Sequence, residues 1–187
     1  WEQSDGDAAL ALRHSAVDAL LQVSGPTLGA INGLCITGGV EIALACDLLI
    51  ASSEAKFADT HVKVGLLPGW GGSARLVQRV GLQRAKELAF TGRFFSAEEA
   101  LAWGLLNRVV APEQLLAEAK TLALQMLANP PAGLRAYKQL LDDEAAGTLA
   151  QALHTETSAS QASNAGVSRE TIETRLAALR RQGKPGA

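Results

Sequence analysis

The sequence lacks the features on which secreted, nucleic-acid-binding and metal-binding proteins depend. Of its 187 residues only two are cysteines and 4% are aromatic, and 17 Lys plus Arg nearly balance 19 Asp plus Glu. Cys35 and Cys46 have neither CxxC nor Cys/His ligand spacing, so a disulfide framework is excluded and no metal site is indicated. We interpret both as reduced core residues of an intracellular protein. The balanced charge gives no basic stripe for nucleic acid and no polybasic patch for a membrane.

An uninterrupted hydrophobic span is also missing. The longest uncharged stretch runs over residues 19–40, but Gly25-Pro26, Asn32-Gly33 and Gly38-Gly39 interrupt it. We therefore interpret it as core with turns rather than as a membrane span. The acidic and polar start of the chain, residues 1–7, differs from a secretory signal, so we predict a cytoplasmic protein without membrane association.

Short apolar runs alternate with helical patterns in the first 111 residues. Buried strands are predicted over residues 27–31, 34–37, 48–51, 56–58 and 105–110. Helices are predicted over residues 8–23, 40–46, 73–80 and 84–90, and after a capping box that begins at Ser96. From Pro112 onward the pattern is helical, over residues 112–128, 131–143, 148–163 and 168–181. We predict an α/β fold with a core over residues 1–111 and a helical region over residues 112–187 of the same domain.

Gly38 and Gly39 join a strand to a helix that is apolar except for Glu41. The first amides of a helix lack internal partners and carry the positive end of the helix dipole, so they can hold an anion or a developing oxyanion. Glycine allows a substrate carbonyl to approach this backbone closely. The Glu41 carboxylate, in the first helical turn, would lie beside whatever the amides hold. A general base beside an oxyanion hole suits proton transfer at the carbon next to a carbonyl.

Glu41 has a second interpretation, in which it only complements the dipole of its own helix. Because a buried carboxylate is costly, the apolar helix around Glu41 favours a catalytic role. Two other interpretations of the glycines, a dinucleotide-binding turn and a hydrolase nucleophile turn, have less support in the sequence. Residues 32–39 do not supply the GxGxxG of a dinucleotide fold, and no Ser lies between Gly25 and Asp47 to act as a hydrolase nucleophile.

Several blocks of the sequence resemble the crotonase family of enoyl-CoA hydratases and isomerases. The blocks are Ala30–Gly33, Gly38–Asp47, Phe57-Ala58, Gly65–Gly72, Thr91-Gly92, Ser96–Ala100 and Gly104-Leu105. They occur in family order and spacing and cover nearly all of the chain. The resemblance implies a crotonase-like spiral of ββα units followed by a carboxyl-terminal helical trimerisation region, and so a homotrimer or hexamer. It also implies acyl-CoA thioester substrates, with coenzyme A as part of the substrate, and no metal or redox cofactor.

The resemblance further implies roles for single residues. Gly38 matches one of the two amide donors to the thioester oxygen, and Glu41 matches the first of the hydratase's two catalytic glutamates. The position of the second glutamate, four residues after Phe57, holds His61 instead. Histidine titrates near neutral pH and can act as acid or base. Alternatively, His61 is a neutral hydrogen-bonding group in a site retuned for another task.

Four further residues are expected to line the substrate pocket: Gly39, Pro68, Gly69 and Trp70. Trp70 replaces a small residue that is common in the family, so it either packs against its neighbours or narrows the acyl pocket. The chain begins at Trp1 rather than at Met, and family members carry an amino-terminal region with the second oxyanion amide and much of the CoA pocket. We therefore expect that this region, roughly the first third of a family member, is absent from the sequence.

The leading hypothesis is an enoyl-CoA hydratase-like enzyme that adds water across trans-2-enoyl-CoA. The Gly38 N–H would stabilise the enolate, Glu41 would be the main acid/base, and His61 would be its partner. The alternatives are a non-catalytic acyl-CoA-binding homologue and another crotonase reaction, namely isomerisation, decarboxylation or thioester hydrolysis.

Overall fold

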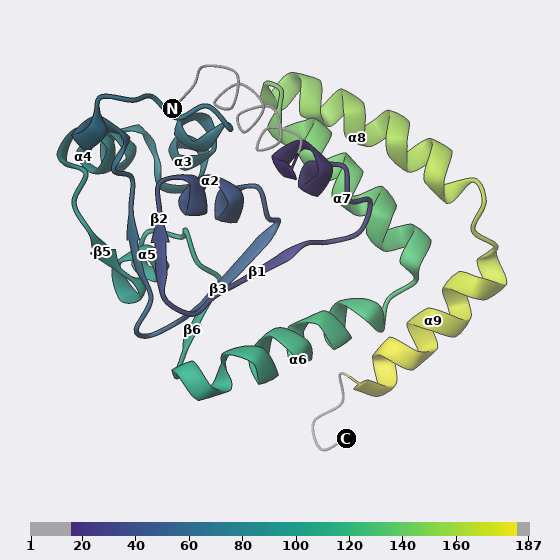
Figure 1. Cartoon of the computed structure of the whole chain (residues 1–187). Coiled ribbons are helices and arrows are strands. Elements are labelled where there is room, and N and C mark those ends of the chain that lie inside the picture. Colours follow the sequence, from purple (N-terminus) through teal and green to yellow (C-terminus); the bar gives the residue numbers. More distant parts are fainter. Residues whose placement is uncertain (1–15, 183–187) are drawn as a thin grey trace. The chain divides into compact units, whose positions relative to one another are not determined.

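The computed structural model describes residues 16–182, with side chains for residues 16–177 (Figure 1). The chain forms two compact units, which divide between Pro131 and Ala132. The first unit carries strands β1 to β6, and the second carries the helices that follow Pro131. Of the helix predicted over residues 8–23, residues 16–21 are helical, and residues 8–15 lie outside the described part of the chain.

The strands of the first unit form two three-stranded sheets. The first sheet has the order β1 (Leu28–Ile31), β3 (Leu48–Ser52) and β6 (Arg108–Val110), and all its pairs are parallel. The second sheet has the order β2 (Leu34–Ile36), β4 (Lys56–Ala58) and β5 (Phe95–Ser96). In it β2 and β4 are parallel, and β4 and β5 are antiparallel.

Two successive strand–strand–helix turns produce this arrangement. β1 and β2 lead into α2 (Gly38–Leu44), whereas β3 and β4 lead into the 3₁₀ helix η1 (His61–Val64) and then α3 (Gly72–Val80). The leading strand of each turn enters one sheet and the second strand enters the other. Because β2 and β4 are parallel neighbours, the segments that follow them emerge at the same edge of their sheet. This edge carries both Gly38 and His61.

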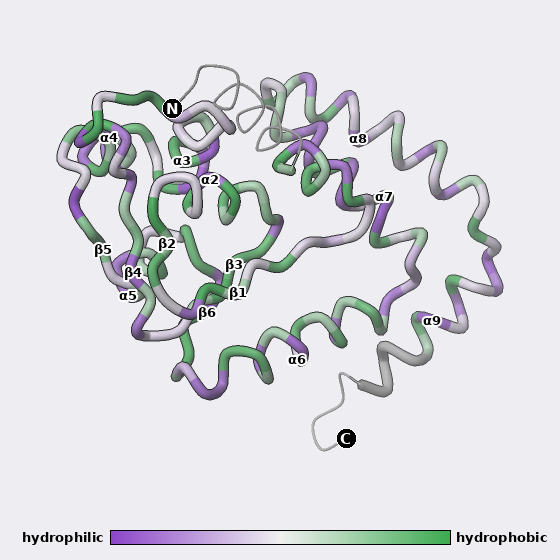
Figure 2. Tube along the Cα trace, in the orientation of Figure 1, coloured by the Kyte–Doolittle hydropathy of each residue, from purple (hydrophilic) through white to green (hydrophobic). Residues whose placement is uncertain are grey.

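The rest of the first unit consists of α4 (Leu82–Thr91), α5 (Ala97–Ala102), the 3₁₀ helix η2 (Pro112–Gln114) and α6 (Leu115–Leu127). The predicted capping box is confirmed: Ser96 Oγ accepts the Glu99 amide, and the Glu99 carboxylate accepts the Ser96 amide. α6 packs against β1 and β3. The Phe57 ring, 1% exposed, stacks on Phe95 with the ring centroids 5.4 Å apart. Hydrophobic residues, green in Figure 2, gather along α2 and the strands around it.

The strand predicted over residues 105–110 is shorter in the structure. Leu105 and Leu106 are buried, but their amides donate to the carbonyl of Ala100 near the end of α5, at 2.9 and 3.4 Å. Their amides therefore do not donate to the sheet. Asn107 makes the transition, because its amide donates to the Leu49 carbonyl at 2.7 Å and its Oδ1 accepts the Leu49 amide at 2.8 Å. The prediction was wrong here because apolar residues that cap a helix end look like strand residues.

The second unit contains α7 (Pro131–Ala145), α8 (Leu149–Asn164) and α9 (Arg169–Gln182). These bounds lie within two residues of the predicted ones. None of the residues of α7 and α8 is buried, and several of their apolar side chains are exposed, among them Tyr137, Leu141, Leu149 and Leu153. The oligomerisation role of residues 112–187 stays a prediction. Across residues 16–182, no helix has both the length and the apolar character needed to cross a bilayer.

Leu88 and Leu82 test the burial assigned to α4. Leu88 is 0% exposed and Leu82 is 52% exposed. Leu88→Ala removes buried methyl groups and leaves a cavity, so we expect it to lower the free energy of unfolding by about 2–5 kcal/mol. Leu82→Ala should change it by less than about 1 kcal/mol. Urea unfolding followed by circular dichroism measures both, and equal losses would contradict the assignment.

Cys35 tests the burial of β2. Burial raises the pKa of the Cys35 thiol to about 12, with a further contribution from the neighbouring Cys46. Because the thiolate is the reactive form, we expect iodoacetamide to label Cys35 far more slowly in the folded protein than in urea. Mass spectrometry of the labelled peptides measures the two rates. Similar rates in both states would show that Cys35 is accessible in the folded protein.

Candidate active site

Glu41 is a buried carboxylate held by the backbone of another element. Its side chain comes from the first turn of α2, and the residue is 3% exposed. Glu41 Oε1 accepts the Trp70 amide at 2.8 Å and the Gly72 amide at 3.1 Å. Gly72 is the first residue of α3, so the carboxylate lies at the positive end of the α3 dipole. Its hydrogen bonds therefore come from α3 and the preceding loop, and the second oxygen, Oε2, accepts from neither of these two amides.

The loop before α3 is shaped to present those amides. Gly71 has φ 87°, in the left-handed region that favours glycine. A Cβ at Gly72 would lie 2.6 Å from Glu41 Cγ, so a side chain there would displace the carboxylate. Arg75 Nη1 donates to the Trp70 carbonyl at 2.7 Å and holds the loop from the side of α3. The glycine-rich loop thus binds the Glu41 carboxylate through backbone amides.

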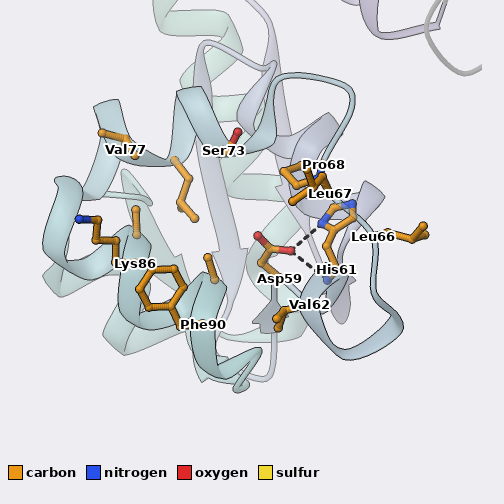
Figure 3. A pocket seen from close by; sticks show the side chains of 13 residues that line it. Asp59, His61, Val62, Leu66, Leu67, Pro68, Ser73, Val77, Lys86 and Phe90 are labelled. Carbon is orange, nitrogen blue, oxygen red and sulfur yellow. Dashed lines mark hydrogen bonds and ion pairs between the residues drawn. The ribbon is translucent and has the colours of Figure 1, made fainter.

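His61 lies between two carboxylates. It begins η1 and is 9% exposed. Its Nε2 is 3.6 Å from Glu41 Oε2, and its Nδ1 is 2.6 Å from Asp59 Oδ1. The backbone amide of His61 also donates to Asp59 Oδ1, at 3.2 Å. Figure 3 shows the two contacts that Asp59 makes with His61. Asp59, His61 and Glu41 therefore form a chain of three titratable side chains.

Gly38 starts α2, where a helix amide has no intrahelical acceptor. The Trp70 ring packs against it, since a Cβ at Gly38 would lie 2.7 Å from the ring. The preceding residue, Thr37, has φ 53°, which is strained for a β-branched side chain. The Thr37 amide donates to the Ala58 carbonyl at 2.8 Å, and its hydroxyl lies 2.5 Å from that of Thr60. These bonds to the neighbouring ββα turn fix the direction of the first α2 amides.

A cavity of about 480 Å³ opens beside Asp59 and His61. Its wall is mainly apolar, formed by residues of η1, the glycine-rich loop, α3 and α4, with Lys86 and Phe90 on the side away from His61 (Figure 3). The apolar lining suits an apolar ligand.

Glu41 Oε2 and His61 Nε2 lie 3.6 Å apart, and Gly38 starts the helix that carries Glu41. The catalytic roles of these three residues stay predictions. Of the four residues expected to line the pocket, Pro68 lines the cavity, whereas Gly39, Gly69 and Trp70 are not among its lining residues. Gly39 follows Gly38 in α2, and Trp70 contributes its amide to Glu41 and its ring to Gly38. The role of these residues toward a substrate stays a prediction. Among the described residues, no group of three or more His, Cys, Asp or Glu side chains could hold a metal ion.

Sequence reasoning missed three components of this site. The amides of Trp70 and Gly72 carry no residue-type signal, because every residue except proline has one. Arg75 resembles any surface arginine of an amphipathic helix. Asp59 did leave a signal, since an acidic residue two positions before a histidine can cap the turn and pair with the ring.

Comparison with known proteins adds independent information. The family model described as enoyl-CoA hydratase/isomerase matches residues 9–176. A probable enoyl-CoA hydratase of Mycobacterium bovis is 42% identical over 139 residues, which are 74% of this chain and 53% of that relative. The solved enoyl-CoA hydratase of Bacillus anthracis is 30% identical, with a TM-score of 0.88, and the match covers 99% of this chain and 70% of that one. A putative enoyl-CoA hydratase of Thermobifida fusca in complex with acetoacetyl-CoA is 34% identical, with a TM-score of 0.80, over 86% of this chain and 63% of that one.

The chain belongs to the enoyl-CoA hydratase/isomerase family, within the crotonase superfamily. The match to the Bacillus anthracis structure, with its TM-score of 0.88, confirms the predicted crotonase-type α/β fold. The chain spans about half the length of the curated relative that it matches, 53% for the Mycobacterium bovis protein.

Gly72 provides a test of how Glu41 is held. Because a Cβ at this position would overlap the Glu41 side chain, Gly72→Ala should lower the free energy of unfolding by about 1–3 kcal/mol. Gly33 is the control, because a Cβ there meets nothing within 4 Å and its φ is not in the left-handed region. Thermal unfolding of both variants measures the difference, and a Gly72→Ala protein as stable as Gly33→Ala would contradict the packing.

Proposed function

We propose that the protein adds water across the double bond of trans-2-enoyl-CoA thioesters. The observation that carries this proposal is the pair formed by Glu41 Oε2 and His61 Nε2, which face each other at 3.6 Å. Hydration needs one group that takes a proton from water and another that delivers a proton to C2. Two buried proton carriers in contact, beside the first amides of α2, supply both groups.

Glu41 is suited to be the base. The two amides at Oε1 fix the orientation of the carboxylate and leave Oε2 facing His61. Oε2 takes a proton from water while the water oxygen forms its bond to C3. The electron pair of the double bond moves onto the thioester oxygen, and the Gly38 amide donates a hydrogen bond to the resulting enolate.

His61 is suited to be the acid. In its protonated form it lies between the carboxylates of Glu41 and Asp59, both of which stabilise a positive ring. As the enolate collapses, Nε2 delivers its proton to C2. The proton that Glu41 took from water then passes to His61 Nε2, which restores the starting state. Water has then been added with no net gain or loss of protons by the enzyme.

Two findings support a CoA thioester as the substrate. The Thermobifida fusca relative was solved in complex with acetoacetyl-CoA. The mainly apolar cavity has room for an acyl chain beside His61, the proposed acid, whereas Glu41 and Gly38 are not among its lining residues. Coenzyme A would thus arrive as part of the substrate.

Other elements of the proposal follow from the family likeness. They are a homotrimer or hexamer assembled through residues 112–187, a cytoplasmic location, and catalysis without a metal or redox cofactor. Membership of the enoyl-CoA hydratase/isomerase family supports each of them.

Glu41→Gln tests the proposed function. The amide cannot accept the proton of water, so kcat for hydration should fall by at least about 100-fold while acyl-CoA binding is kept. The assay follows the loss of enoyl-thioester absorbance with short and medium trans-2-enoyl-CoAs, using protein expressed from the complete reading frame. Glu54→Gln is the matched control, because Glu54 is exposed in the turn between β3 and β4.

Three outcomes would contradict the proposal. Unchanged kcat in Glu41→Gln would remove Glu41 from the mechanism. Wild-type protein that binds acyl-CoA without turnover would be a binding homologue. Turnover to a product other than the 3-hydroxyacyl-CoA, identified by mass spectrometry, would indicate another reaction of the family.

A further inference from the structure

We propose that Asp59 is a positioning residue that sets the tautomer of His61 and holds the orientation of its ring. This inference rests on the proposed function, because it explains how His61 can replace a carboxylic acid as the proton donor. The geometry that carries it is the pair of contacts on opposite sides of the ring, Nδ1 to Asp59 and Nε2 to Glu41.

The contact with Asp59 decides which nitrogen carries the proton in the neutral ring. Asp59 Oδ1 is 2.6 Å from His61 Nδ1, and an ionised carboxylate offers only acceptors. Nδ1 must therefore carry a hydrogen in both the neutral and the charged ring. The proton that His61 gains and loses is then the one on Nε2, the atom that faces Glu41 Oε2.

Asp59 is itself well fixed. Its Oδ1 also accepts the backbone amide of His61 at 3.2 Å, and its side chain is 14% exposed. One carboxylate oxygen thus binds the residue at two points, which holds the ring relative to the η1 backbone. The same arrangement orients a histidine by an aspartate in other enzymes that transfer protons through an imidazole.

The charges around His61 come from several elements. Glu41 faces it from α2 and Asp59 from the end of β4, whereas Lys63 follows on η1 and Lys86 of α4 lines the same cavity. The two carboxylates are the groups in contact with the ring, so loss of Asp59 removes half of that negative charge. Without Asp59 the ring keeps, among the described residues, only one carboxylate neighbour, Glu41.

Asp59→Asn tests the inference by kinetics. We expect kcat for hydration to fall by at least about 10-fold with KM changed by less than about 2-fold, since Asp59 acts on the proton donor. Asp18→Asn, at an exposed aspartate, should alter neither property.

A double-mutant cycle separates this role from a structural one. Asp59 also caps η1 through the His61 amide, and a cap would be needed whatever residue stands at position 61. If Asp59 acts through the ring, Asp59→Asn in a His61→Gln background should cause no further loss of kcat. The same loss in both backgrounds would overturn the inference.

A second measurement needs no hydratase activity. Long-range ¹H–¹⁵N NMR distinguishes the two tautomers of a neutral histidine, and this chain has only three histidines. We expect the neutral His61 ring to be protonated at Nδ1, and to lose that preference in Asp59→Asn. A wild-type ring protonated at Nε2 alone would overturn the inference. The Nδ1–H tautomer in a protein without hydratase activity would overturn the proposed function instead.

Discussion

The proposed chemistry depends on how the Glu41 carboxylate is held. Two backbone amides bind Oε1, and the other oxygen faces His61. A buried carboxylate without such donors would lose its hydrogen bonds to water and have no protein hydrogen bonds to replace them. The Trp70 and Gly72 amides can reach Glu41 only because the loop before α3 has a left-handed conformation at Gly71 and no side chain at Gly72. The glycine-rich loop therefore belongs to the active site through its backbone.

Parallel strand pairing brings together Glu41 and His61, the two proposed proton carriers. β2 and β4 are neighbours in one sheet, so α2 and η1 leave that sheet at the same edge. The hydrogen bonds of Thr37 to Ala58 and Thr60 fasten the two turns to each other. Beneath them, Phe57 on β4 stacks on Phe95, so the position of His61 is supported by the core. The contacts that hold these elements together therefore also position Glu41 and His61.

Local signals account for what the sequence could predict. Gly38, Gly39 and the apolar helix around Glu41 mark a strand, a turn and a buried helix, and these features do not depend on distant residues. The amides that bind Glu41 were not predictable, because they depend on the packing of α2 against α3 and every residue type but proline offers one. Leu105 is buried, but its amide donates to Ala100 in α5 and not to a strand, so the strand predicted there was wrong. The spacing of Asp59 and His61 was visible, but the direction of the ring depends on the η1 backbone.

The most direct test is a crystal structure of the protein from its complete reading frame with a bound 3-hydroxyacyl-CoA. We expect the thioester oxygen to accept a hydrogen bond from the Gly38 amide. We also expect the C3 hydroxyl within about 3 Å of Glu41 Oε2, with C2 beside His61 Nε2. A bound product whose C3 hydroxyl contacts neither Glu41 nor His61 would contradict the proposed mechanism.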